Sequence, residues 1–158
     1  MSYSKFLAMI ATSTIIMFGL MYLNTFAWDH VFFSETRSYM ALYMGAVMAI
    51  VMLAFMLGMY TNTTANIVIF VVAIFVFAGS LYLVRSQDTI EDVSWMKAMI
   101  PHHSIAILTS SRANISDPRV RQLADDIIKA QELEIAEMKA LIADLNGGPA
   151  ATPEIDGK

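Results

Sequence analysis

Long uncharged stretches dominate the first half of the chain. Three of them, residues 6–27, 38–60 and 66–84, are apolar almost throughout. Each is close to the ~20 residues that a helix needs to cross the ~30 Å hydrocarbon core of a bilayer. The pattern predicts three transmembrane helices. The first stretch also resembles a signal peptide, with 25–27 as a poor cleavage site, but it is longer than a usual signal core, and we expect an uncleaved span.

The second half of the chain follows a helical spacing instead. A first helix is expected over 89–114, started by Asp88 and interrupted by Pro101. A second is expected to begin after the cap Asp117 and to end at Leu145, before an Asn-Gly-Gly-Pro stop. The predicted fold is all-α: a three-helix transmembrane region (1–87), a helical-hairpin domain (88–146) and a flexible tail (147–158).

The second of these helices carries a regular 4,3 spacing that is typical of a packed seam. The seam contains Val120, Ala124, Ile127, Gln131, Glu134, Met138, Leu141 and Leu145. A carboxylate on such a seam is costly unless it is paired, protonated or bound to a cation. Glu134 is therefore a candidate ligand. The alternative is that a slight rotation of the helix brings Glu134 to solvent and that Gln131 only fixes the register.

The first helix of the hairpin carries two thioethers and two imidazoles within eight residues, at Met96, Met99, His102 and His103. Residues three and four apart share a helix face, so Met99 neighbours both histidines. Thioether sulfur and imidazole nitrogen suit copper, above all Cu(I). With Glu134 and Met138 on the facing helix, these residues form the predicted metal site. The alternative is a helix that packs through methionine and exposes two histidines.

Cysteine and charge narrow the chemistry. The chain has no cysteine, which excludes disulfides, thiolate metal sites and thiol catalysis. Its net charge of −4 comes entirely from the residues after Val84, which include 12 acidic and 8 basic side chains. This balance argues against nucleic-acid binding, which needs a basic surface. Lys5 favours a cytoplasmic N-terminus, so three spans would place the C-terminal domain outside the cytoplasm.

The residues of the hairpin resemble a known family. Asp92-x-x-Trp95-Met96-x-x-Met99-Ile-Pro-His102-His103, followed by Gln131-x-x-Glu134-Ile-x-x-Met138, is similar to the bacterial family called domain of unknown function 305. The resemblance covers about 88–145 and implies a ferritin-like helical half-bundle with a histidine pair, in an exported or membrane-attached protein. Some members are connected with copper binding and tolerance. The chain has no Glu-x-x-His motif, so di-iron chemistry is not expected.

Family members often carry two copies of the hairpin, whereas this chain has one. A second copy is expected from another subunit, giving a homodimer or higher homo-oligomer; the hairpin could instead pack on its own spans. We expect a non-enzymatic, copper-binding protein of the bacterial inner membrane, with an extracytoplasmic domain that buffers Cu(I) or passes it to a metal-handling partner. The alternative is a non-catalytic interaction module with a structural polar seam, and a metal-dependent oxidase ranks last.

A second methionine pattern lies in the second apolar stretch. Met40, Met44, Met48, Met52 and Met56 recur every four residues along this helix. A relay of thioethers for Cu(I) is one interpretation. We favour the other, that methionine is a flexible apolar residue for packing, because no charged or histidine side chain joins the stripe.

Overall fold

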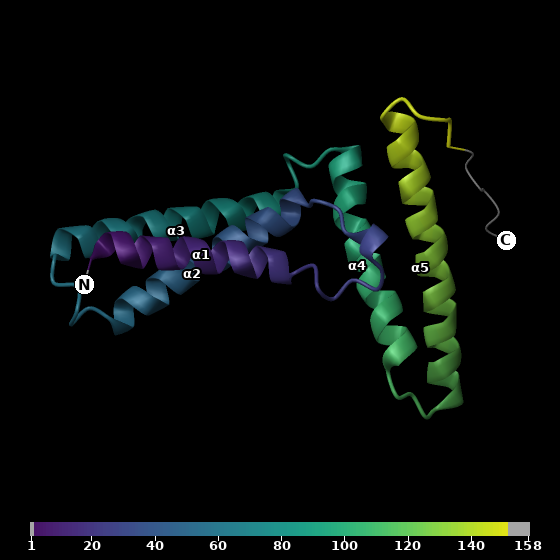
Figure 1. Ribbon diagram of the computed structural model, residues 1–158, viewed down its shortest axis with the longest axis horizontal. Helices are drawn as coiled ribbons and strands as arrows, with labels where there is room; N and C mark the ends of the chain where they lie inside the picture. Colours follow the sequence, from purple (N-terminus) through teal and green to yellow (C-terminus); the bar gives the residue numbers. More distant parts are fainter. Residues whose placement is uncertain (1, 152–158) are drawn as a thin grey trace. The chain divides into compact units, whose positions relative to one another are not determined.

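The computed structural model describes residues 2–151 and is all-helical over that range (Figure 1). It contains α1 (Tyr3–Leu20), the short 3₁₀ helix η1 (Trp28–His30), α2 (Glu35–Phe55), α3 (Thr63–Ser86), α4 (Asp92–Arg112) and α5 (Pro118–Leu145). These elements form two compact units. The first contains α1, α2 and α3, and the second contains residues 22–34 together with the chain from residue 91. Most of the predicted tail, 152–158, lies outside the described residues.

Three helices of the first unit are long and apolar enough to cross a membrane, as the sequence predicts. Both α1 and α3 pack against α2. Asn62 caps α3 through its side-chain oxygen, which accepts from the backbone N–H of Ala65 at 3.0 Å. Two spans end earlier than expected: α1 ends at Leu20, although the apolar stretch continues to Ala27, and α2 ends at Phe55, five residues before the end of its stretch. Hydropathy alone did not show these endings, because each apolar stretch continues past the end of its helix.

Small residues and one polar cluster hold the first unit together. Its buried core contains Phe6, Ala46, Ala49, Leu53, Tyr60 and Ala73. The Tyr3 hydroxyl donates to Asn66 Oδ1 at 2.8 Å, and Asn66 in turn donates to the carbonyl of Tyr60 at 2.7 Å. Because a buried polar group needs a partner where water is absent, these bonds fix the N-terminal end of α1 against the start of α3.

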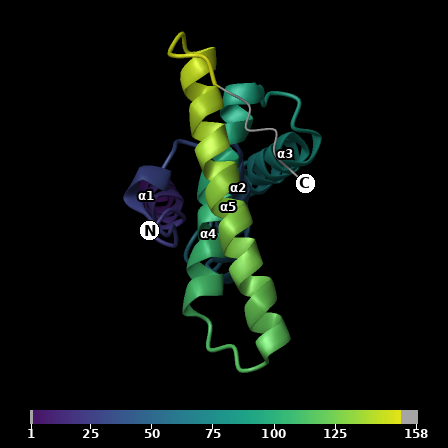
Figure 2. The same ribbon diagram turned by 90° about the vertical axis from the view of Figure 1, so that its right-hand side faces the viewer.

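The second unit is an antiparallel hairpin whose helices α4 and α5 lie side by side in both views (Figures 1 and 2). Asp117 caps α5 and accepts from the N–H of Arg119 at 2.8 Å, and α5 ends at Leu145, both as predicted. The N-cap of α4 is Glu91 instead of the expected Asp88, which accepts a hydrogen bond from Tyr82. The helix α4 continues through Pro101 uninterrupted, although the sequence predicts an interruption there.

Residues 22–34, which join α1 to α2, fold onto this hairpin. Phe32 packs against the α4–α5 core, and η1 contacts α4. The Tyr22 hydroxyl accepts from the N–H of Ser34 at 3.1 Å and so ties the two ends of the segment together. We call residues 22–34 the docking loop. Its docking makes this connection part of the hairpin unit, whereas the sequence grouped it with the spans.

Candidate functional site

The buried face of the hairpin sets which side chains meet. Its core contains Met96, Ile100, Ile107, Ile135, Met138 and Ile142, with Met99 and Ile128 packed beside it. On α5 the face that meets α4 therefore runs through Ala124, Ile128, Gln131, Ile135, Met138 and Ile142.

This face corrects the predicted seam. The two 4,3 registers share Ala124, Gln131 and Met138, but the structure buries Ile135 and Ile142 at the positions that follow Glu134 and Leu141, and partly buries Ile128 beside Ile127. The predicted seam residues Val120, Leu141 and Leu145 are exposed instead. Burying isoleucine is favourable, whereas burying a carboxylate is costly, and this difference selects the register by a small rotation of the helix.

His103 and Glu134 come together across the hairpin, as the sequence predicts. Nδ1 of His103 lies 2.8 Å from Oε2 of Glu134, with side chains that are 16% and 50% exposed. The same Oε2 accepts from Gln131 Nε2 at 3.2 Å. Nδ1 is buried and, despite its closeness to the carboxylate, makes no contact with hydrogen-bond geometry. Glu134 is thus partly solvated at the edge of the packed face, and one of its oxygens faces an imidazole nitrogen.

The other predicted ligands divide into buried sulfurs and an exposed imidazole. Met96 and Met138 are 5% and 6% exposed and belong to the core, while Met99 is partly buried against it. His102 is exposed, and its ring centre lies 6.2 Å from that of His103. Over residues 2–151, no three His, Asp, Glu or Cys side chains are grouped so that they could hold a metal ion.

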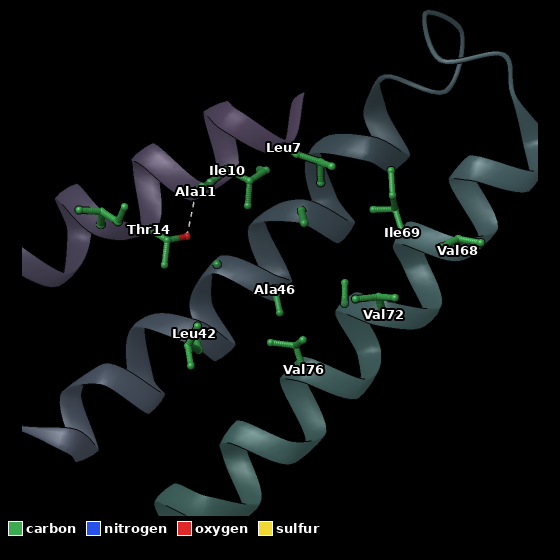
Figure 3. A pocket seen from close by; sticks show the side chains of 14 residues that line it. Leu7, Ile10, Ala11, Thr14, Leu42, Ala46, Val68, Ile69, Val72 and Val76 are labelled. Carbon is green, nitrogen blue, oxygen red and sulfur yellow. Dashed lines mark hydrogen bonds between the residues drawn. The ribbon is translucent and has the colours of Figure 1, made fainter. Parts of the chain in front are cut away.

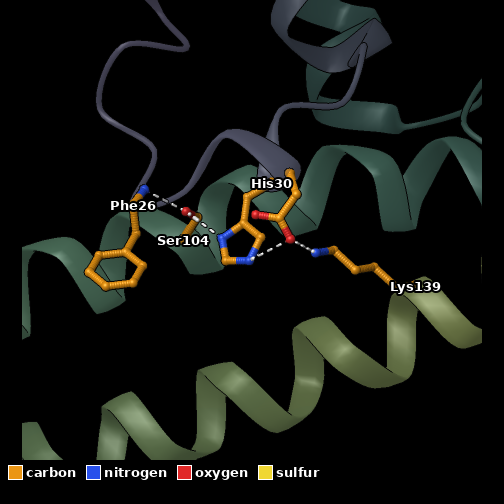
Figure 4. A network of polar contacts seen from close by, with 5 residues as sticks. Phe26, His30, Ser104 and Lys139 are labelled. Carbon is orange, nitrogen blue, oxygen red and sulfur yellow. Dashed lines mark hydrogen bonds and ion pairs between the residues drawn. The ribbon is translucent and has the colours of Figure 1, made fainter.

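A second polar cluster, which the sequence analysis missed, holds the docking loop on α4 (Figure 4). Ser104 is fully buried, and its Oγ accepts from the N–H of Phe26 at 2.7 Å. The same oxygen lies 2.9 Å from Nδ1 of His30. One signal for the cluster was present in the sequence: Ser104 lies on the apolar stripe of Ile100 and Ile107, where a hydroxyl needs a partner.

The charges around this cluster favour a neutral His30. Lys139 of α5 donates to Asp29 Oδ2 at 2.6 Å, and this hydrogen bond lowers the pKa of the Asp29 carboxyl. Burial of the imidazole, together with the nearby Lys139 ammonium, lowers the pKa of His30 despite the opposing effect of Asp29. Nδ1 of a neutral ring can accept a hydrogen bond from the Ser104 hydroxyl, while the hydroxyl oxygen accepts one from the N–H of Phe26.

The Ser104, His30 and Asp29 side chains do not form a hydrolytic triad. The Ser104 hydroxyl has no exposed surface and already accepts a backbone N–H, so a substrate carbonyl cannot reach it. Nε2 of His30 is 4.0 Å from Asp29 Oδ2, beyond hydrogen-bond distance. The chemistry of the cluster is that of a structural polar network, which satisfies buried groups where the docking loop meets the hairpin.

Comparison with known proteins finds one similar protein and one matching family. An uncharacterised protein of Acanthamoeba polyphaga mimivirus is 40% identical over 84 residues, which is 52% of this chain and 52% of that protein. The chain thus spans about half the length of this relative, and the relative is viral, so a bacterial origin is not supported by it. No solved structure matches the chain. Residues 84–154 match the family described as Domain of unknown function (DUF305), the family that the motifs of the hairpin indicate.

Proposed function

We propose that this protein binds copper, as Cu(I), through the methionines and histidines of its hairpin, and that α1–α3 attach it to a membrane. The observation that carries the proposal is the meeting of His103 and Glu134 across the hairpin, where the buried Nδ1 lies 2.8 Å from Oε2 of the carboxylate. An imidazole nitrogen and a carboxylate oxygen that already lie this close could bind the same ion.

Thioethers on neighbouring turns would supply the soft ligands that Cu(I) prefers. Met99 lies four residues before His103 on α4, and Met138 lies four residues after Glu134 on α5. Met96 lies one turn further along the α4 stripe. Because Met96 and Met138 are already core residues, binding through them would couple copper to the packing of the hairpin.

The exposed His102 suits a different role from His103. Adjacent residues point about 100° apart on a helix, so the two rings need not serve one site equally. His103 is the main imidazole ligand in this proposal, and His102 either completes the site or receives copper from a metal-handling partner. The protein would then buffer Cu(I), contribute to tolerance or transfer the ion, and act as a binding protein without catalysis.

The proposed location is the bacterial inner membrane, with the hairpin on the extracytoplasmic side. The support is the single basic residue near the N-terminus, Lys5, combined with an odd number of candidate spans. A reporter fused after Lys158 is expected to be active only outside the cytoplasm. Activity of a cytoplasm-restricted reporter at the same position would contradict this orientation.

Copper titration of the purified full-length protein tests the proposal. Competition with a chromophoric Cu(I) chelator should give a binding site that His103→Ala abolishes and that His102→Ala weakens less. Met99→Leu should weaken Cu(I) far more than Zn(II), because only the soft ion benefits from the thioether. His30→Gln, a histidine variant outside the site, is the matched control. Undiminished affinity in a His102→Ala, His103→Ala double variant would refute the copper site.

An interaction module is the second candidate, and one observation favours it. The outer surface of α5 exposes apolar side chains, at Val120, Leu123, Leu133, Leu141 and Leu145. A second hairpin packed on this surface would complete a four-helix bundle as an isologous homodimer or a higher homo-oligomer. Leu123→Glu combined with Leu141→Glu should then produce monomers, as measured by mass photometry in detergent. A wild-type protein that is monomeric in both detergent and lipid would exclude the dimer.

A further inference from the structure

The first unit contains an apolar groove between α1 and α3 (Figure 3). Both helices pack on α2, and over their described residues their backbones make no close approach to each other. The floor is formed by α2, through the small residues Gly45, Ala46 and Ala49 together with Leu42. Leu7, Ile10 and Ala11 contribute to one wall, and Val68, Val72 and Val76 contribute to the other. The groove encloses about 520 Å³.

The lining offers nothing to a polar ligand. Thr14 is the one lining residue with a polar side chain, and its hydroxyl donates to the carbonyl of Ile10 at 2.8 Å, as the dashed line in Figure 3 shows. The hydrogen-bonded cluster of Tyr3, Asn66 and Tyr60 lies about one helical turn beyond the Leu7 end of the groove. Tyrosines and amides of this kind suit the membrane–water interface, so the groove begins just inside the hydrocarbon.

The dimensions of the groove select its occupant. Its lining runs from Leu7 to Ile15 on α1 and from Val68 to Val76 on α3, which at 1.5 Å per residue is about 12 Å. One leaflet contributes about half of the ~30 Å hydrocarbon thickness, or ~15 Å. The groove therefore matches the depth that one acyl chain spans in a single leaflet.

A helix from a second copy fits this groove poorly. A helix about 10 Å wide with a 1.5 Å rise occupies roughly 120 Å³ per residue, so the groove would accept only about four residues. The accessible surface area of the groove is also far below the ~800 Å² that each partner buries in a stable protein interface. An unfilled apolar groove would forfeit dispersion contacts on its open side, and a flexible hydrocarbon chain restores them.

We propose that this groove is a lipid site that binds one acyl chain of a bilayer phospholipid, in the leaflet that contains the N-terminal end of α1. The site depends on α1–α3 spanning a membrane and is independent of copper binding by the hairpin. The bound acyl chain packs between α1 and α3 in the position that a fourth helix would otherwise occupy. Lipid at this position would differ from the surrounding bilayer lipid in being held on three sides by protein.

Photocrosslinking with a matched set of variants tests the site. The full-length protein is placed in nanodiscs of dioleoyl phosphatidylcholine that contain a phosphatidylcholine with a diazirine in its acyl chain, and labelled residues are mapped by mass spectrometry. Val72→Trp fills the groove from α3, whereas Ile74→Trp introduces the same side chain on the same helix outside it. The two wild-type side chains are almost equally exposed, at 54% and 55%, so the comparison isolates the groove.

The wild type should be labelled preferentially on the groove residues, and Val72→Trp should lower that labelling about tenfold, which corresponds to ~1.4 kcal/mol of binding free energy. Ile74→Trp should leave the labelling unchanged. Ala11→Trp and Ala8→Trp repeat the test on α1, because Ala11 lines the groove and Ala8 does not. Even labelling of all lipid-facing residues, equal labelling in each matched pair, or crosslinks from a second copy across the groove would overturn the proposal.

Discussion

Replacement of Ser104 by alanine should release the docking loop from the hairpin. The substitution removes the oxygen that accepts the Phe26 N–H and the hydroxyl that lies against His30 Nδ1, at 2.7 and 2.9 Å. Alanine favours the helix and differs from serine only in lacking the hydroxyl, so the rest of this fully buried position is unchanged. The effect therefore measures the polar network alone.

The cost follows from two buried groups that lose their partner. A buried donor or acceptor without a hydrogen bond costs ~1–3 kcal/mol. The Phe26 N–H has a fixed position, but the His30 ring, which is 12% exposed, can turn toward water and recover part of its loss. We expect a total of about 2–4 kcal/mol, which falls on the docking loop because α4 and α5 share a separate apolar core.

Amide hydrogen exchange measures the loss of the hydrogen bond directly at the Phe26 N–H. Exchange of the Phe26 amide should become at least about 30-fold faster in Ser104→Ala, the factor that corresponds to ~2 kcal/mol. Amides in the core of α5 should change little. Ser111→Ala is the matched control, because Ser111 is on the same helix but is exposed and donates only to Leu108 within its own turn. Unchanged exchange of Phe26 in Ser104→Ala would refute the assigned role of this hydroxyl.

Three further predictions concern packing and pH. A Cβ on Gly45 would lie 2.3 Å from Thr14 Oγ, so Gly45→Ala should destabilise the first unit by about 1–3 kcal/mol in a thermal melt, whereas the unobstructed Gly79→Ala should not. Ile135→Ala should cost about 2–5 kcal/mol in denaturant unfolding, against less than ~0.5 for the exposed Leu133→Ala. Because the pKa of His30 is lowered from 6.5, the unfolded loop binds the proton more readily. Docking should therefore weaken as the pH falls below 6.5, seen as a smaller protection factor of the Phe26 amide after correction for its intrinsic exchange rate, and His30→Gln should remove this dependence.

The sequence determined the helices and the pairing of the two hairpin helices. Three apolar stretches of span length have few alternatives, since in lipid only a helix satisfies its own backbone polar groups over a single segment. Asp117 and Pro118 fix the start of α5 through local capping geometry, which depends on neighbouring residues alone. The sequence also placed His103 and Glu134 on facing helices, and the structure brings them together, although Glu134 lies at the edge of the packed face and not on the seam.

Only the tertiary structure decided the register of α5 and the role of residues 22–34. Two heptad registers one residue apart both contain Ala124, Gln131 and Met138, and the choice depended on which side chains α4 could bury. The first part of the docking loop, as far as Ala27, continues an apolar run, so its composition does not distinguish it from the helix before it. Its position rests on the hydrogen bond from Phe26 to Ser104, 78 residues away in the sequence. A contact of that separation is set by packing between elements, which local sequence patterns do not encode.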